Sequence, residues 1–204
     1  MILYDSPNPA PNPRRVRIFM AEKGIEIPIQ SVSLIAREHK GAEHISRNPL
    51  GQTPVLLLDD GTALSESIAI CRYLEALNPA PPLFGESALE IATIEMWIRR
   101  TEFALGGPVR NYWVNVHPFT AKVVPQRFED FGRANVPHAM AAMAVFDAAL
   151  AQSEFIAGAR YSVADVILLA TVDFAGFIGL GIPETLNNLR RWHADVSDRP
   201  SASA

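Results

Sequence analysis

The chain changes character at a proline cluster, Asn78-Pro79-Ala80-Pro81-Pro82. Before it, short extended segments alternate with helical ones, whereas every periodic segment after it is helical. A dense proline run between periodic segments indicates a linker, because proline lacks a backbone donor and fits neither a helix interior nor a central strand. We therefore expect an α/β domain over residues 1–78, a linker at 79–87 and an all-α helical domain over residues 88–204.

The residues before the cluster predict the element order βαβαββα. Ile2-Leu3-Tyr4 is a short strand pattern that leads into a loop with prolines at positions 7, 9, 11 and 13. A helix is expected from Pro13 to Lys23, with Asn12 as its N-cap and Gly24 as its stop. The remaining elements are a strand near 27–32, an irregular helix within 37–47, strands at 55–58 and 62–64 around a turn, and a helix capped by Ser65 that runs to about Leu77.

Apolar residues at helical spacing dominate the second half of the chain. We expect a helix from Ser87 to about Val116 that breaks or kinks at Gly106-Gly107-Pro108. Further helices are expected at 125–152, 162–179 and 183–196. Ser162 and Asp165 have the spacing of a capping box, which is a structural feature and needs no ligand.

Charge and hydropathy exclude two classes of partner. The 204 residues carry a formal net charge of −4, so the chain has no broad cationic field for nucleic acid. The most apolar segment, 163–182, contains Asp165 and Asp173, and an aspartate near the centre of a bilayer is costly. A buried helix is therefore expected there, and neither nucleic acid nor a membrane is expected as a partner.

The cysteine and the histidines predict neither a disulfide nor a metal. Cys71 is the only cysteine and cannot form an internal disulfide, which together with the N-terminal sequence favours a reducing cytoplasm. On the apolar face of a helix, this thiol is expected to be a core residue and not a nucleophile. The five histidines are too scattered for a metal motif, and no glycine-rich phosphate loop occurs, so we expect no metal and no nucleotide.

Three features of the first domain can bind a small polar ligand. The first strand, the proline loop and the following helix place free N–H groups and a helix dipole at one spot, which suits a thiolate. In Gln52-Thr53-Pro54, a cis Thr53–Pro54 bond would turn the Thr53 backbone outward to pair with an extended peptide. At Ser65-Glu66-Ser67, a helix start and the Ser67 hydroxyl can bind a carboxylate while Glu66 accepts from an ammonium group. Together they would recognise a zwitterionic amino-acid end.

These segments resemble those of the glutathione S-transferases. The matching stretches are Asn48-Pro49 through Thr53-Pro54-Val55, then residues 64–70, and in the second domain Phe155-Ile156-Ala157-Gly158 with residues 161–166, which are similar to the family's helix-capping signature. The resemblance covers nearly the whole chain. It implies a thioredoxin-like α/β first domain, an all-α second domain, and glutathione as cosubstrate. It also implies a homodimer in which the first domain of one subunit packs on the helical domain of the other.

The resemblance also assigns roles to individual residues. It implies that Thr53 pairs with the cysteinyl backbone of glutathione, and that Glu66 and Ser67 hold the γ-glutamyl end. His39 falls where the family often places a residue for the glycine carboxylate, and Lys40 and Gln52 are alternatives. The full set implied for glutathione is Ala10, Asn12, His39, Lys40, Gln52, Thr53, Pro54, Glu66 and Ser67.

The sequence departs from the family at the residue that activates the sulfur. Aligned on the helix, residues 10–18 resemble the motif of the zeta-like and bacterial nu-like classes, and Ala10 then stands at the usual serine or cysteine position. Asn12 matches the nu-like asparagine and could donate its amide to the sulfur, although an asparagine before a proline is also a typical N-cap. Aligned on the strand, Tyr4 and Ser6 are nearer, so the catalytic residue stays open between Asn12, Ser6 and Tyr4.

Three functions are compatible with these residues. The first is a glutathione transferase whose thiolate attacks a small hydrophobic electrophile, with Phe103, Tyr112 and Trp113 as candidate substrate-pocket residues. The second is a glutathione-dependent disulfide reductase, in which a second glutathione performs the exchange. The third is a noncatalytic glutathione-binding scaffold, which is suggested by the absence of a reactive group on Ala10.

Overall fold

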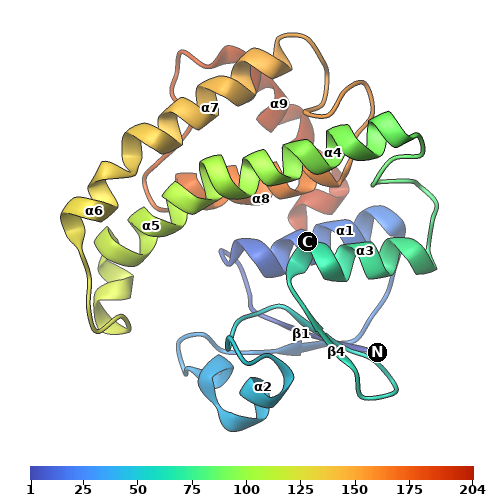
Figure 1. Ribbon diagram of the computed structural model, residues 1–204, viewed down its shortest axis with the longest axis vertical. Helices are drawn as coiled ribbons and strands as arrows, with labels where there is room; N and C mark the ends of the chain where they lie inside the picture. The colour runs from blue at the N-terminus through green and yellow to red at the C-terminus, as the bar shows by residue number, and fades with distance from the viewer. The chain divides into compact units, whose positions relative to one another are not determined.

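The computed structural model describes all residues from 1 to 204 and divides them into two compact units (Figure 1). Unit 1 contains residues 1–83 together with 200–204, and unit 2 contains residues 84–199. The chain therefore returns to the first unit at its end, whereas the sequence pattern assigns these last residues to the helical half.

The C-terminal tail is held in unit 1 by polar bonds to α1 (Pro11–Lys23). Within the tail, Pro200–Ser203 form a short 3-10 helix, η4. Arg14 donates to the carbonyl of Ala202 at 2.9 Å, and the hydroxyl of Ser201 donates to the carboxylate of Glu22. These bonds join residues almost two hundred positions apart, so no local pattern could predict them.

Unit 1 is a mixed four-stranded sheet with helices on both faces, and the predicted thioredoxin-like order βαβαββα is confirmed. The sheet order is β2-β1-β3-β4, in which β2 runs parallel to β1 and the other pairs are antiparallel. Figure 1 shows α1 and α3 side by side on one face and α2 on the other. The elements are β1 (Ile2–Asp5), α1, β2 (Ile29–Ser31), the 3-10 turn η1 (Glu38–Lys40), α2 (Ala42–Arg47), β3 (Val55–Leu57), β4 (Ala63–Ser65) and α3 (Ser67–Leu77).

Helix α1 begins two residues earlier than the sequence predicts. Its N-cap is Ala10, so Pro11, Asn12 and Pro13 occupy its first three positions. The prediction of Asn12 as the N-cap is therefore wrong. Two prolines fit into this first turn because the N–H groups of a first turn have no partner inside the helix. Gly24 ends the helix as expected, in a left-handed conformation with φ of 63°.

Helix α3 also begins two residues away from its predicted cap. Ser65 is the last residue of β4, where it pairs with Val55, and the helix begins at Ser67. Strand pairing has overridden the capping preference of Ser65 at this point. On α3, Cys71 is buried, and burial raises the pKa of its thiol well above the ordinary value. Cys71 is thus a core residue, as expected, and unsuited to act as a thiolate nucleophile.

Unit 2 is built from helices, with two departures from the predicted boundaries. The predicted helix over 125–152 is split in two at Asn135, before Pro137, and the last helix begins at Asn187 instead of Pro183. The predicted kink is a π-helical turn, where Pro108 lacks the N–H that a regular helix needs. No helix has the length and apolar character needed to cross a bilayer. The elements are α4 (Ala88–Arg100), the π turn η2 (Thr101–Gly106), α5 (Gly107–Val116), the 3-10 turn η3 (Pro118–Lys122), α6 (Glu129–Ala134), α7 (Val136–Leu150), α8 (Val163–Phe177) and α9 (Asn187–Ser197).

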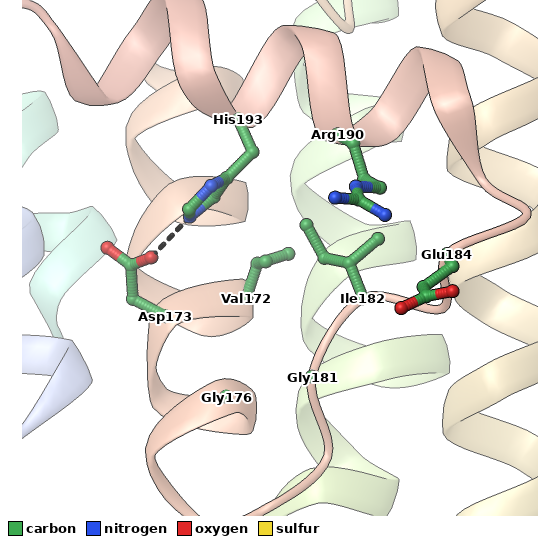
Figure 2. Close-up of a pocket in the computed structure, with 8 residues that line it drawn as sticks. All are labelled: Val172, Asp173, Gly176, Gly181, Ile182, Glu184, Arg190 and His193. Carbon is green, nitrogen blue, oxygen red and sulfur yellow. Dashed lines mark hydrogen bonds and ion pairs between the residues drawn. The ribbon is translucent and has the colours of Figure 1, made fainter.

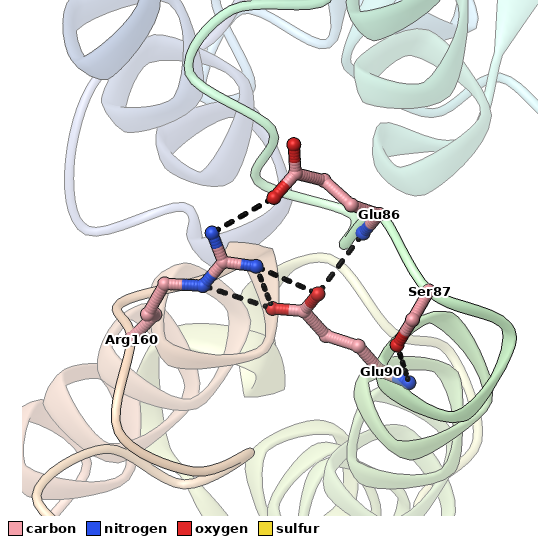
Figure 3. A network of polar contacts seen from close by, with 4 residues as sticks. All are labelled: Glu86, Ser87, Glu90 and Arg160. Atoms are coloured by element: carbon pink, nitrogen blue, oxygen red, sulfur yellow. Dashed lines mark hydrogen bonds and ion pairs between the residues drawn. The ribbon is translucent and has the colours of Figure 1, made fainter.

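Arg160, in the loop before α8, binds the residues that start α4 (Figure 3). Its guanidinium donates to Glu86 at 3.0 Å and to the two carboxylate oxygens of Glu90 at 2.6 and 2.7 Å. Glu90 also accepts from the backbone N–H of Glu86, and its own N–H donates to the N-cap Ser87. The backbone bond from Glu86, followed by the bonds from Arg160, holds the pKa of Glu90 below its ordinary value. The network fixes the first turn of α4 within unit 2.

Helix α8 forms the core of unit 2, and residues 163–172 are all buried. Among them, Asp165 accepts four hydrogen bonds. The N–H of Ile156 and the indole N–H of Trp192 donate to one oxygen at 2.9 Å each, and the N–H and hydroxyl of Ser162 donate to the other at 3.0 and 3.1 Å. The predicted capping box is therefore present, and it also joins α9 and the loop before α8.

We expect the stability contributed by Asp165 to depend on pH. Burial raises the pKa of this carboxyl to about 6, although its four hydrogen bonds favour the carboxylate. Because the folded pKa lies above the unfolded one, the contribution is full below about pH 4 and is lost as pH rises through 6. Urea unfolding of Asp165→Asn should show the largest difference from wild type near about pH 4, and a smaller, constant one above about pH 7.

The difference that remains at high pH should be about 1–3 kcal/mol, because an amide keeps only one of the two oxygens, each of which accepts two of the four bonds. Asp130→Asn, on the exposed surface of α6, is the matched control for loss of a carboxylate. A difference for Asp165→Asn that did not change between acid and neutral pH would contradict the raised pKa.

Candidate functional site

One arginine of α1 holds the loop that follows β1. Arg17 donates to the carboxylate of Asp5 at 2.6 Å, to the carbonyl of Ser6 at 3.1 Å and to the side-chain oxygen of Asn8 at 2.6 Å. Asp5 is buried, and burial raises the pKa of its carboxyl while the neighbouring guanidinium acts in the opposite direction. Charge-assisted bonds to three acceptors therefore fix the chain between β1 and α1.

The same loop is joined to the segment before β3 through two hydroxyls. Ser6 is fully buried, and its hydroxyl donates to the carbonyl of Val32 at 3.0 Å and lies 2.9 Å from the hydroxyl of Thr53. Since the Ser6 hydrogen goes to Val32, the Thr53 hydroxyl is the donor between the two. The Thr53–Pro54 bond is cis. The backbone N–H and C=O of Thr53 form no hydrogen bond within the chain.

The residue before Thr53 is held by two side chains from the α2 region. The carbonyl of Gln52 lies 2.9 Å from Nε2 of His44 and accepts from the side-chain amide of Asn48 at 3.0 Å. Because a carbonyl only accepts, Nε2 of His44 carries the hydrogen. Asn48 also accepts from the N–H of Leu50 at 3.1 Å, which shapes the turn that leads to Gln52. The two bonds to the carbonyl of Gln52 therefore fix the direction of the peptide group between Gln52 and Thr53.

A close approach at Gly51 completes this turn. Gly51 has φ of 57°, and Lys40 donates to its carbonyl at 2.7 Å and to that of Leu50 at 3.1 Å. A Cβ at Gly51 would lie 2.7 Å from Ile45 and 2.8 Å from the carbonyl of His39. Burial lowers the pKa of His39, with nearby cations acting in the same direction, so its imidazole is mainly neutral at pH 7.

Glu66 and Ser67 stand together where β4 ends and α3 begins. Glu66 is exposed and adopts φ of 68°, a region that non-glycine residues enter only when their surroundings require it. Ser67 occupies the first position of α3, where the N–H groups have no partner inside the helix. A carboxylate acceptor and a helix N-terminus are therefore adjacent, as the sequence predicts.

The start of α1 offers few backbone donors. Pro11 and Pro13 have no N–H, and the N–H of Arg14 donates to the carbonyl of Ala10 at 3.4 Å. The free donors of the first turn are therefore the backbone N–H of Asn12 and its side-chain amide, which is exposed and does not cap the helix. Because the two prolines have no N–H, Asn12 is the residue of this turn whose hydrogen-bond donors are free.

Tyr4 contacts a different part of unit 1. The guanidinium of Arg47, on α2, lies 4.2 Å from the centre of its ring, and Tyr4 lines a cavity of about 550 Å³ together with His44 and Arg47. Successive side chains of a strand point to opposite faces, and the next residue, Asp5, binds Arg17 of α1. Tyr4 therefore faces α2, whereas Asn12 lies on α1 across the sheet.

In unit 2, the three predicted pocket residues have different surroundings. Phe103 lies in the π turn with 72% of its surface exposed, and Tyr112 is half-buried on α5. Trp113 belongs to an aromatic cluster with Phe174 and Phe177 of α8, at centroid distances of 5.3 and 6.3 Å. The cluster also contains His117 and Phe119, which follow Trp113 along the chain.

Sequence reasoning missed the residues that position these groups. Nothing in the run Arg14-Arg15-Val16-Arg17 distinguishes the arginine that binds the loop, and His44 is one of several scattered histidines. For Phe174 and Phe177 a signal existed, since two aromatics at helical spacing interrupt the aliphatic sequence of α8. No group of three or more histidine, cysteine, aspartate or glutamate side chains in the structure could hold a metal ion.

Known proteins resemble the chain over almost its whole length. Residues 10–77 match the glutathione S-transferase N-terminal domain, and residues 119–200 match the corresponding C-terminal domain. Glutathione S-transferase 2 of Saccharomyces cerevisiae is 37% identical, covering 98% of this chain and 87% of the relative. The crystal structure of Gtt2 from the same yeast superposes with a TM-score of 0.94 at 35% identity, covering 100% of this chain and 99% of the other. A glutathione S-transferase domain-containing protein of Marinobacter aquaeolei has a TM-score of 0.94 at 36% identity, with 98% and 99% coverage.

We expect Gly51 to be required for stability. Gly51→Ala should lower the free energy of unfolding by about 2–4 kcal/mol, because the added Cβ combines a left-handed backbone with close contacts to Ile45 and His39. Gly24→Ala is the matched control, since Gly24 has φ of 63° and a Cβ there meets nothing within 4 Å. That variant should lose only about 1 kcal/mol. Urea unfolding measures both, and equal losses would show that the packing at Gly51 contributes nothing.

Proposed function

The chain belongs to the glutathione S-transferase family, whose members are glutathione-binding transferases, and from this premise we propose that its unit 1 activates the thiol of bound glutathione for attack on an electrophilic, apolar substrate. The observation that carries the proposal is the unpaired backbone N–H and C=O of Thr53, held in a fixed direction beside the loop that leads to α1. An extended peptide can add to such an edge through main-chain hydrogen bonds.

In this proposal the two ends of glutathione bind to groups on either side of Thr53. Glu66 accepts from the γ-glutamyl ammonium group, and Ser67 with the first N–H groups of α3 binds the adjacent carboxylate. The glycine carboxylate binds near η1 and the turn before Thr53, where His39, Lys40 and Gln52 are the candidates. Because His39 is mainly neutral at pH 7 and Lys40 already donates to two carbonyls, His39 would act as an N–H donor and Lys40 as a nearby cation.

We assign the sulfur contact to Asn12, with Ser6 and Tyr4 as less suitable candidates. Ser6 donates its hydroxyl hydrogen to Val32, so it has no second hydrogen for a thiolate. Tyr4 faces α2. Asn12 has an uncommitted amide and an uncommitted backbone N–H at the positive end of α1, and two donors of this kind favour a thiolate over a thiol.

The remaining parts of the proposal concern the electrophile and the assembly. Aromatic residues of unit 2, for which Phe103, Tyr112 and Trp113 are the candidates, suit a planar apolar substrate. We also propose that the protein acts as a homodimer in the cytoplasm, where a single buried thiol such as Cys71 stays reduced. Apart from glutathione, the reaction needs no cofactor in this proposal.

Calorimetric titration with glutathione tests the role of Glu66. Glu66→Ala should weaken binding by more than about tenfold, because it removes the charged acceptor of the ammonium group. Glu66→Gly should weaken binding equally and in addition stabilise the protein by about 1 kcal/mol, because glycine adopts φ of 68° without strain. Unchanged affinity in both variants would remove Glu66 from the site.

Turnover with two substrates tests the chemistry. A transferase should conjugate a chlorinated nitroaromatic faster than it reduces a mixed disulfide of glutathione. Faster turnover of the mixed disulfide would identify a reductase, and binding without turnover of either substrate would identify a scaffold.

The sulfur contact of Asn12 is tested by the pKa of the bound thiol, which is measured from the absorbance of the thiolate. Asn12→Ala should raise this pKa by about one unit. Asn187→Ala, which removes an exposed asparagine at the start of α9, should leave that pKa unchanged and is the matched control.

A further inference from the structure

A second cavity lies within unit 2, between the C-terminal half of α8, the start of α9 and the segment that joins them (Figure 2). Its volume is about 550 Å³, which is sufficient for a small organic molecule. Its lining is Val172, Asp173 and Gly176 from α8, Gly181, Ile182 and Glu184 from the joining segment, and Arg190 and His193 from α9. None of these residues takes part in the glutathione site proposed above.

Arg190 presents an uncommitted cation to this cavity. Its neighbour Arg191 donates to the carbonyls of Leu150 and Ser153 and to Asp195, and so has a structural role. Arg190 has no such acceptor, and Figure 2 shows its guanidinium directed down from α9 toward Ile182 and Glu184. A guanidinium with free N–H groups beside an apolar surface matches the geometry of a carboxylate.

His193 lies on the same wall, one helical turn after Arg190. Its Nε2 is 2.5 Å from the carboxylate of Asp173, which fixes the ring against α8. Residues three apart on a helix share a face, so Arg190 and His193 both face the cavity from above. Two carboxylates therefore line the cavity as well, Asp173, which is bound to His193, and Glu184.

The opposite side of the cavity is apolar and unfilled. Val172 is buried and Ile182 is half-buried, so both present hydrocarbon to the cavity. The two glycines leave the space between them open, because a Cβ added at Gly176 or at Gly181 would meet nothing within 4 Å. The cavity therefore combines one unpaired guanidinium, that of Arg190, with an apolar floor.

We propose that this cavity binds a small organic carboxylate with an apolar body. The carboxylate binds the guanidinium of Arg190, and the hydrocarbon part lies on Val172 and Ile182 over the two glycines. Glu184 competes with the ligand for Arg190, because it carries the same charge as the ligand at the edge of the cavity. The site is independent of glutathione, so its occupancy is measurable whether or not unit 1 has the function proposed for it.

Binding of naphthoate, measured by calorimetry and by amide NMR shifts of the full-length protein, tests this site. The ligand should shift the signals of Gly176, Gly181 and Ile182, and its uncharged analogue naphthamide should bind about tenfold more weakly. Arg190→Gln should weaken naphthoate binding about tenfold, whereas Glu184→Gln should strengthen it about threefold. Arg133→Gln, an exposed arginine of α6, is the control for loss of a positive charge.

Gly176→Leu tests the cavity without damaging the fold. The new side chain enters open space, and leucine favours a helix more than glycine does, so the variant should be at least as stable as wild type. It should also weaken naphthoate binding by about tenfold or more, because it fills the space of the hydrocarbon part. Naphthoate binding that ignores Gly176→Leu and Arg190→Gln would overturn the proposal. Weaker binding in Glu184→Gln would overturn it too, because the ligand would then be recognised as a cation.

Discussion

The carbonyl of Gln52 is the point on which the geometry of unit 1 depends. It accepts from His44 and from Asn48, so the peptide group that follows it has one direction only. An unpaired backbone group is costly when buried, yet it is a binding edge when it is exposed and fixed. The two bonds to the carbonyl of Gln52 fix the direction of the Thr53 backbone. The contact between the hydroxyls of Thr53 and Ser6 holds the loop after β1 against the same segment. The polar groups next to Thr53 are thus bonded within the chain, whereas the backbone of Thr53 itself is unpaired.

At the start of α1, too, only a few polar groups remain without a partner, and here they lie at the positive end of the helix dipole. A helix N-terminus normally presents several N–H groups, and any of them could bind an anion. Here Pro11 and Pro13 remove two, and Arg14 uses its own within the helix. The dipole remains, but its hydrogen-bonding capacity is confined to Asn12. Ala10 has no hydroxyl or thiol, and the free donors of this turn are the side-chain amide and the backbone N–H of Asn12.

The order of elements could be predicted from the sequence, but the exact positions of two helix starts could not. Asn12 and Ser65 are good capping residues taken singly, and tertiary structure overrode both, through a first turn with two prolines and through the pairing of β4. The cis bond at Thr53–Pro54 and the place of Glu66 beside a helix start could be predicted, because both depend on contiguous segments. The roles of Arg17 and His44 could not, since they depend on which acceptors the fold brings near, and three similar arginines offer no way to choose.

In helix α8, the residues that anchor the core of unit 2 differ, apart from Val172, from the residues that line the cavity. From Val163 to Val172 it is buried on all sides and anchored by the four bonds to Asp165, so change there would be costly. Beyond Val172 only Ala175 is buried in α8, and the other side chains fall into two sets. Asp173 and Gly176 line the cavity with α9, whereas Phe174 and Phe177 join the aromatic cluster around Trp113. The first ten residues thus anchor α8, whereas its last turns expose side chains on two faces.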